Sequence, residues 1–168
     1  MNNTLKAGIC GAFLLLGAHT AFAADAEDFV DDASAKGIAE IEAGKSALQK
    51  SQSQDVKTFA QMMIDDHTKA NEKLKSIATQ KKLEVASDAE LMDKAKKMIL
   101  DIRDESFDRS YANNQVKAHE QTIEIFKKEA NEGKDADLKA FAKETLPKLE
   151  AHLQAAKKLA AAHGGDAK

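Results

Sequence analysis

The sequence contains very few cysteine, proline or aromatic residues. Among its 168 residues there is one cysteine, Cys10, one proline and no tryptophan, and aromatic residues make up 5%. Cys10 lies in an N-terminal apolar segment that we expect to be removed. Its removal would exclude disulfides and thiolate metal or redox sites from the remaining chain. Because aromatic and β-branched residues favour strands, their scarcity argues against a sheet protein.

Long hydrophobic runs are also missing, apart from a short one near the N-terminus. Lys6 is followed by an apolar run over residues 7–16 and by the small-residue pattern Ala21-Phe22-Ala23. The run has about ten residues, too few to span a bilayer. The pattern predicts a secretory signal peptide over residues 1–23, and therefore a periplasmic protein of residues 24–168. We expect no membrane span after cleavage.

The chain has no excess of positive charge. It carries 25 Lys and Arg against 28 Asp and Glu, for a net charge of −3, and its basic residues are scattered. Nucleic-acid-binding domains gather basic residues on one face, so we expect no nucleic-acid partner. Charged residues make up 32% of the chain, and strong helix formers dominate it. This composition is typical of helical bundles.

Apolar residues recur at helical spacing over four long segments, with an extra helical stretch at 89–102 between the second and the third. The four predicted helices span about 26–52, 55–81, 107–132 and 136–162. Ser87 and Glu90 have the spacing of a capping box. We therefore predict an all-α, antiparallel four-helix bundle in one domain, ordered over about 27–162.

Two further patterns describe how the helices pair. The segment DVKTFAQ at 55–61 resembles DLKAFAK at 137–143, which suggests two related helical hairpins. In the first helix, Gly37 and Gly44 lie on the apolar face with Ile38 and Ile41. Glycines there would let a neighbouring helix approach closely.

Three histidines lie on the apolar faces of three predicted helices: His67 on the second, His119 on the third and His152 on the fourth. Each could be a core residue whose ring is hydrogen-bonded to the next helix. Inward side chains from facing helices also build metal sites in bundles. The sequence leaves open whether the three rings lie at one level.

Carboxylates near the histidines complete the predicted site. Glu42 lies at one edge of the first helix's apolar face and Glu40 at the other, while Asp66 precedes His67. We predict that Asp66 either binds the metal or orients an imidazole. Such donors suit zinc, iron, copper or manganese. The predicted metal ligands are Glu42, His67, His119 and His152, with Asp66 beside them.

Three segments resemble a secreted bacterial family of unknown function, the domain-of-unknown-function 4142 family, which is described as ferritin-like and often labelled an outer membrane protein. They are FAQMMIDDHTKANEKL, FDRSYANNQVKAHEQTIEIFKKEA and LKAFAKETLPKLEAHLQAAKKL. The resemblance covers about residues 27–160 and includes Asp66-His67, His119 and the LPKLEAH motif at 146–152. It implies an antiparallel ferritin-like bundle outside the cytoplasm and no established activity.

The ferritin-like description raises the question of a di-iron site, which bundles build from Glu-x-x-His motifs on two helices. Ile64, Val116 and Leu149 stand three residues before the three histidines, so the motif is missing. A mononuclear, histidine-rich site is therefore the better expectation.

Three functional hypotheses remain. The leading one is a non-enzymatic periplasmic bundle that binds a transition-metal ion, in metal handling or envelope stress. The first alternative is a cofactor-free structural or protein-interaction module with hydrogen-bonded core histidines. The second is a redox or oxygen-handling ferritin-like enzyme. A protein partner or a homo-oligomer is compatible with each of them.

Overall fold

The computed structural model describes residues 17–103 and 106–166. These residues form helices and connecting turns, with no strand among them, which confirms the all-α prediction. The five helices are α1 (Gly17–Lys50), α2 (Gln54–Lys81), α3 (Asp88–Met98), α4 (Phe107–Glu132) and α5 (Ala136–Ala162).

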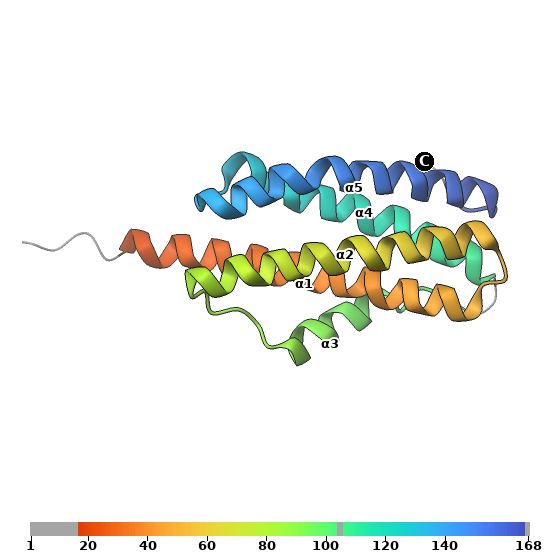
Figure 1. The fold of residues 1–168 in the computed structure, drawn as a ribbon, viewed down its shortest axis with the longest axis horizontal. Helices are drawn as coiled ribbons and strands as arrows, with labels where there is room; N and C mark the ends of the chain where they lie inside the picture. Colours follow the sequence, from red (N-terminus) through yellow and green to blue (C-terminus); the bar gives the residue numbers. More distant parts are fainter. Residues whose placement is uncertain (1–16, 104–105, 167–168) are drawn as a thin grey trace, which may run out of the picture.

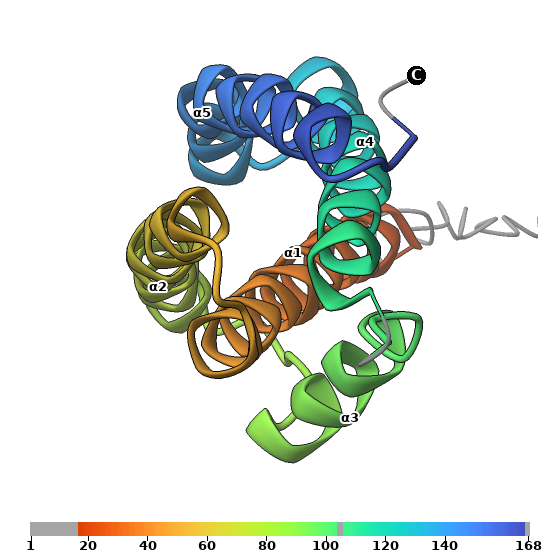
Figure 2. The same cartoon turned by 90° about the vertical axis from the view of Figure 1, so that its right-hand side faces the viewer.

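The four long helices lie side by side, and α3 lies outside them (Figure 1). α1 packs chiefly against α2, and α4 against α5, so the chain forms two helical hairpins. The hairpins meet where α1 contacts α4 and where α2 contacts α5, as Figure 2 shows along the helix axes. In Figure 1, α1 and α5 run in one direction and α2 and α4 in the other, so neighbouring long helices are antiparallel.

Local sequence explains several helix ends. The Ser87 hydroxyl accepts a hydrogen bond from the Glu90 backbone N–H, and the Glu90 carboxylate accepts one from the Ser87 N–H, so the predicted capping box is confirmed. Asp135 caps α5 by accepting hydrogen bonds from the N–H groups of Asp137 and Leu138. These contacts satisfy donors that a helix N-terminus leaves without intrahelical partners.

Two helix boundaries differ from the prediction. α1 begins at Gly17 rather than near residue 26, because the alanine-rich segment before Asp25 favours a helix. α3 ends at Met98 rather than at 102, since the Ile99 N–H bonds to the Lys96 carbonyl three residues back and tightens the chain into a turn. Most of the predicted signal peptide, residues 1–16 with Cys10, lies outside the described residues.

The two glycines of α1 do allow close approach, as predicted. A Cβ atom at Gly44 would lie 2.9 Å from the Ala60 carbonyl oxygen of α2 and 2.9 Å from the Ile64 side chain. A Cβ atom at Gly37 would overlap the Asn71 amide, which donates a hydrogen bond to the Ser34 carbonyl at 3.2 Å. The absence of a side chain at Gly44, which faces the α2 backbone, therefore permits the close approach of α1 and α2, whereas Gly37 leaves room for the Asn71 side chain.

The apolar core is divided into two clusters along the bundle. The first lies near the α1–α2 turn and includes Phe59, Met63 and Tyr111. The second lies near the α4–α5 turn and includes Phe29 and Phe126. The site described below lies between them.

Between the clusters, each long helix contributes one buried ionisable residue. On α2, His67 follows Met63 of the first cluster and precedes Leu74 of the second. The corresponding residues of the other helices occupy the same position between the two clusters. We call this set the central polar layer: Glu40, His67, His119 and His152.

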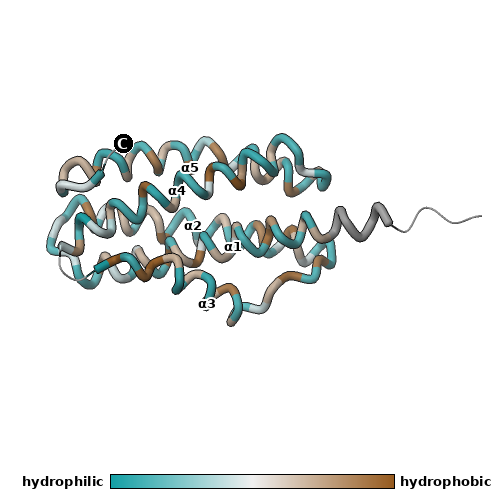
Figure 3. The backbone as a smooth tube through the Cα atoms, turned by 180° about the vertical axis from the view of Figure 1, so that it is seen from behind, coloured by the Kyte–Doolittle hydropathy of each residue, from teal (hydrophilic) through white to brown (hydrophobic). Residues whose placement is uncertain are grey.

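Among residues 17–103 and 106–166, none of the helices contains an apolar stretch of the length that a bilayer span requires. Figure 3 shows hydrophilic and hydrophobic residues mixed along the coloured parts of every helix. The hydrophobic residues of each helix therefore form a face within the bundle rather than a continuous apolar segment.

Candidate metal centre

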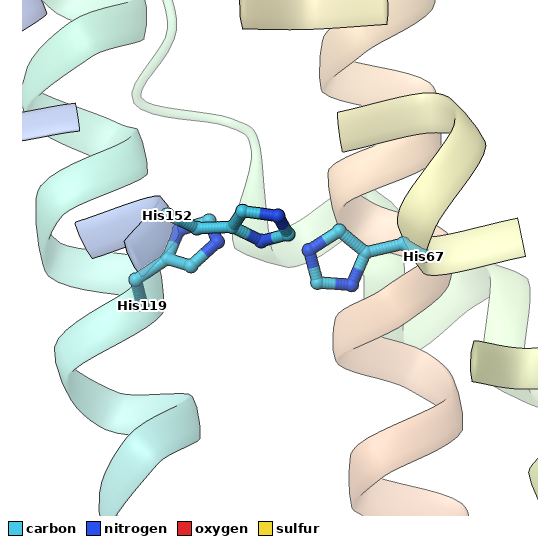
Figure 4. Close-up of side chains that lie close together, drawn as sticks. All are labelled: His67, His119 and His152. Atoms are coloured by element: carbon cyan, nitrogen blue, oxygen red, sulfur yellow. The ribbon is translucent and has the colours of Figure 1, made fainter. Parts of the chain in front are cut away.

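The structure brings the three predicted histidines together. His67 is 6% exposed, His119 is 1% exposed and His152 is 3% exposed, and they come from α2, α4 and α5. Their ring centroids are 5.5 to 5.6 Å apart in all three pairs. Figure 4 shows the rings pointing toward one another across the bundle. One ligand nitrogen from each ring lies within 4.8 Å of the other two.

Hydrogen bonds set the tautomers of two rings. His119 Nδ1 lies 2.8 Å from the Gln115 carbonyl oxygen, and His152 Nε2 lies 2.9 Å from Asp66 Oδ2. Because a carbonyl and a carboxylate only accept, these ring nitrogens carry the protons. In the neutral rings, His119 Nε2 and His152 Nδ1 therefore have free lone pairs.

Each ring has one buried nitrogen without a hydrogen-bond partner among the described residues. These atoms are His67 Nε2, His119 Nε2 and His152 Nδ1. A buried polar atom without a partner costs about 1–3 kcal/mol. These three nitrogens lie on converging rings and can act as metal ligands. No described residue forms a hydrogen bond with any of them.

Burial keeps two of the rings neutral. Loss of hydration lowers the pKa of His67 well below its ordinary value, and positive charge on His119 or His152 would lower it further. Burial also lowers the pKa of His152, although the hydrogen bond with Asp66 partly offsets this. Neutral imidazoles offer lone pairs to a metal, whereas imidazolium rings do not.

Asp66 orients His152 from the side opposite its free nitrogen. Its carboxylate accepts hydrogen bonds from His152 Nε2 and from Lys148 Nζ, each at 2.9 Å. Burial raises the pKa of Asp66, but the hydrogen bonds from Lys148 and His152 outweigh it, so the pKa lies below its ordinary value. A carboxylate that holds a metal-binding imidazole in this way fixes the tautomer and strengthens the ligand.

The structure does not bring Glu42 to the histidines. Its side chain is 32% exposed and pairs with Lys45 at 2.8 Å on the bundle surface. Residues two apart in a helix differ by about 200° in direction, so Glu40 and Glu42 face opposite ways. Glu40, which is 3% exposed, is the inward acid of α1.

The apolar face of α1 explains why the sequence did not single out Glu40. The prediction centred that face on Ile38 and Ile41, which are only partly buried. The fully buried positions include the small residues Ala43 and Ala47, because α2 approaches α1 closely. Glu40 lies three residues before Ala43, so the small residues rather than the large ones indicated the inward face.

Comparison with known sequences identifies the family. The sequence profile of a family described as "Domain of unknown function (DUF4142)" matches residues 16–159. The chain belongs to the DUF4142 family. All four residues of the central polar layer lie within the matched part of this DUF4142 chain. No curated protein matches it, and no solved structure matches it.

Glu40 and two residues of α4 add further unpaired polar atoms to the centre of this DUF4142 bundle. Glu40 Oε2, Tyr111 Oη and both amide atoms of Gln115 are buried without a hydrogen-bond partner. Burial raises the pKa of Glu40, while positive charge on His119 and the neighbouring Gln115 amide lower it in part. The Gln115 side chain lies close enough to the Glu40 carboxyl to lower its pKa, but no hydrogen bond of normal geometry joins the Gln115 amide to it.

The pKa of Tyr111 also depends on Glu40. Burial raises the pKa of Tyr111 well above its ordinary value, and the negative charge of Glu40 raises it further. Glu40 thus lies near Tyr111 and near His119, two residues that are eight positions apart on α4.

Proposed function

We propose that this protein binds one transition-metal ion through His67, His119 and His152, with Asp66 orienting His152. Two observations support the proposal: one nitrogen from each buried ring lies within 4.8 Å of the other two, and each ring has a buried nitrogen without a hydrogen-bond partner among the described residues. Ligand nitrogens on one tetrahedral ion are about 3.3 Å apart, so small rotations of the rings would suffice to coordinate it.

The donor set favours a borderline metal. Three imidazoles suit zinc, copper, iron or manganese, and no thiolate is present among the donors to select a softer ion. The rival hypothesis of hydrogen-bonded core histidines requires partners for the inward nitrogens, and the described residues supply none. The backbone carbonyl of Gln115 and the carboxylate of Asp66 already hold the outward nitrogens of two rings.

The cellular setting and the finer fold type are part of the same proposal. The N-terminal pattern supports secretion to the periplasm, where the bundle would act in metal handling or under envelope stress. The two antiparallel hairpins are compatible with the ferritin-like four-helix arrangement that the resemblance implies. Fractionation of cells that express the full chain, followed by N-terminal sequencing of the periplasmic product, tests secretion and cleavage after Ala23.

Elemental analysis of the untagged protein, purified from periplasm without chelator, tests the metal site. We expect about one equivalent of a single transition metal, from a one-ion site with three imidazole ligands. His67→Ala should weaken binding by more than about 100-fold, beyond the 10- to 100-fold typical of losing an orienting partner. His163→Ala is the matched control, because His163 pairs with Asp55 away from the cluster.

Retention of none of zinc, iron, copper and manganese, each added in turn to chelator-treated protein, would overturn the proposal. An unchanged metal content in His67→Ala would overturn the ligand assignment. In the cofactor-free alternative, the thermal midpoint would not respond to metal or to chelator.

A further inference from the structure

The fourth side of the histidine cluster is formed by α1, the one long helix that brings no histidine to it. In its place α1 buries Glu40, which is 3% exposed. In Figure 4 the orange ribbon of α1 runs behind the His67 ring, and the three rings come from the other three long helices. The central polar layer therefore contains three nitrogen donors and one carboxyl group.

Two residues of α4 accompany Glu40. Tyr111, Gln115 and His119 are spaced four residues apart and so form one stripe on α4. Tyr111 and Gln115 are both 0% exposed. α1 packs against α4, and Glu40 lines a hollow together with the chain neighbours of Gln115 and His119, so Glu40 lies beside this part of the stripe.

The unpaired atoms of this group need a polar partner. Glu40 Oε2, Gln115 Oε1, Gln115 Nε2 and Tyr111 Oη have none among the described residues. Leaving buried polar atoms unpaired destabilises the folded state, so native interiors fill such places with water or a ligand. The acceptors and donors here suit a small ligand with oxygen atoms and O–H groups.

Glu40 lies too far out to bind the same metal directly in this geometry. Its carboxylate is not part of the group of ligand atoms that lie within 4.8 Å of one another. Direct ligands of one ion are only about 3.3 Å apart. A carboxylate outside this group can instead accept a hydrogen bond from a ligand on the ion.

We propose that the metal has an exchangeable fourth ligand, a water molecule or another small oxygen-donor ligand, which is hydrogen-bonded to Glu40 and Gln115. This inference rests on the proposed function. Three protein ligands and one open position distinguish metal sites that exchange ligands from closed structural sites. The centre would accordingly accept small anions in place of water.

A surface hollow offers a route to this side of the site. It lies between α1, α3 and α4, has a volume of about 160 Å³, and is lined by Glu40, Lys36, Asn114 and Lys117 among others. Lys36 is half-buried there and donates a hydrogen bond to Gln121 Oε1 at 3.3 Å. Three lysines line the hollow against two acidic residues, Glu40 and Asp101, and this excess of positive charge favours the entry of small anions.

Copper(II) is the probe for the test, because nitrogen sites bind it most tightly among the divalent first-row metals. The full-chain protein is loaded with one equivalent, and its electron paramagnetic resonance spectrum is compared in ordinary and in ¹⁷O-enriched water. We expect line broadening by ¹⁷O, which reports coordinated water. Azide should then replace the water and produce a saturable charge-transfer band.

Substitutions identify the residue that faces the exchangeable ligand. Glu40→Gln keeps the size of the side chain and removes the negative charge that opposes an anionic ligand, so azide should bind at least 10-fold more tightly. Glu42→Gln makes the same charge change on the bundle surface of the same helix and should leave azide affinity within about twofold, because exposed charges are screened. Circular dichroism checks that both variants are folded.

The outcomes separate this inference from the proposed function. Failure to bind copper or any of the other metals overturns both. Copper binding without ¹⁷O broadening in the unsubstituted protein overturns the open position, and that measurement needs no variant. Equal azide affinities in Glu40→Gln and Glu42→Gln overturn the role of Glu40.

Discussion

Acidification of the metal-free protein should destabilise it over the range in which histidine titrates. The pKa of His67 is held well below its ordinary value by burial and by its two histidine neighbours, and burial lowers the pKa of His152. The unfolded chain therefore binds more protons than the folded one as the pH falls through about 6.5. The stability that these groups provide is fully present above that pH and is lost below it.

The slope follows from the number of groups that titrate differently in the two states. Each group contributes at most about 1.4 kcal/mol per pH unit, so two contribute at most about 2.8 kcal/mol per unit. The hydrogen bond with Asp66 partly offsets the effect of burial on the pKa of His152, so His152 contributes less to the slope than His67 does. We expect a loss of about 2–3 kcal/mol between pH 7 and pH 5 in the free energy of unfolding.

Glu40 should oppose the loss of stability on acidification. The sign of its contribution to the free energy of unfolding provides an internal check. Burial raises the pKa of Glu40, so the folded state binds more protons than the unfolded state between about 4.5 and the folded pKa. Its contribution to stability therefore increases as the pH falls. Glu40→Gln removes it and should make the loss of stability on acidification steeper.

The assay is urea unfolding in excess chelator, monitored by circular dichroism, at half-unit steps from pH 7.5 to pH 5. His67→Leu removes the most perturbed ring and should flatten the profile. His163→Ala removes an imidazole that pairs with Asp55 away from the cluster and serves as the control for a histidine substitution outside the site. A flat profile in the unsubstituted protein, or one that rises on acidification, would refute the reasoning.

Two further predictions concern the support of the site and the packing of α1. Asp66→Asn should weaken metal binding about 10- to 100-fold while the protein stays folded, because the orienting carboxylate of His152 is lost; calorimetric titration measures this, and an unchanged affinity would remove Asp66 from the site. Gly44→Ala should lower the free energy of unfolding by about 1 kcal/mol. The added methyl group would overlap the Ala60 carbonyl, which costs about 1–3 kcal/mol. The higher helix propensity of alanine offsets only about 1 kcal/mol of this cost. A urea-unfolding midpoint that rises would show that α1 and α2 can separate without cost.

Local patterns predicted the helices well because their causes are local. The Ser87–Glu90 capping box forms as expected, since its two hydrogen bonds involve residues three apart in the chain. The segments DVKTFAQ and DLKAFAK both lie at the beginning of the second helix of a hairpin, α2 and α5. The apolar spacing likewise placed His67, His119 and His152 on buried faces.

Glu40, the buried acid of α1, shows where prediction of the buried face from apolar spacing fails. Large apolar residues indicate the buried face when helices pack through large side chains. α1 instead packs closely on α2 through Gly37, Gly44 and alanines. The prediction therefore centred the face on Ile38 and Ile41, whereas the structure buries Glu40 and leaves Glu42 paired with Lys45.

Residue types and their spacing are enough to predict that the chain is helical, where most helices begin and end, and that three histidines face inward. These properties depend on side-chain propensities and on the angle of about 100° between successive residues, which act within a few turns of one helix. Tertiary structure alone decided that the three rings meet at one level and that Glu40 shares that level. The relative heights of helices depend on turn geometry, on close contacts such as that at Gly44, and on the packing of the two apolar clusters on either side. These contacts join residues that are far apart in the chain, so no local pattern encodes them.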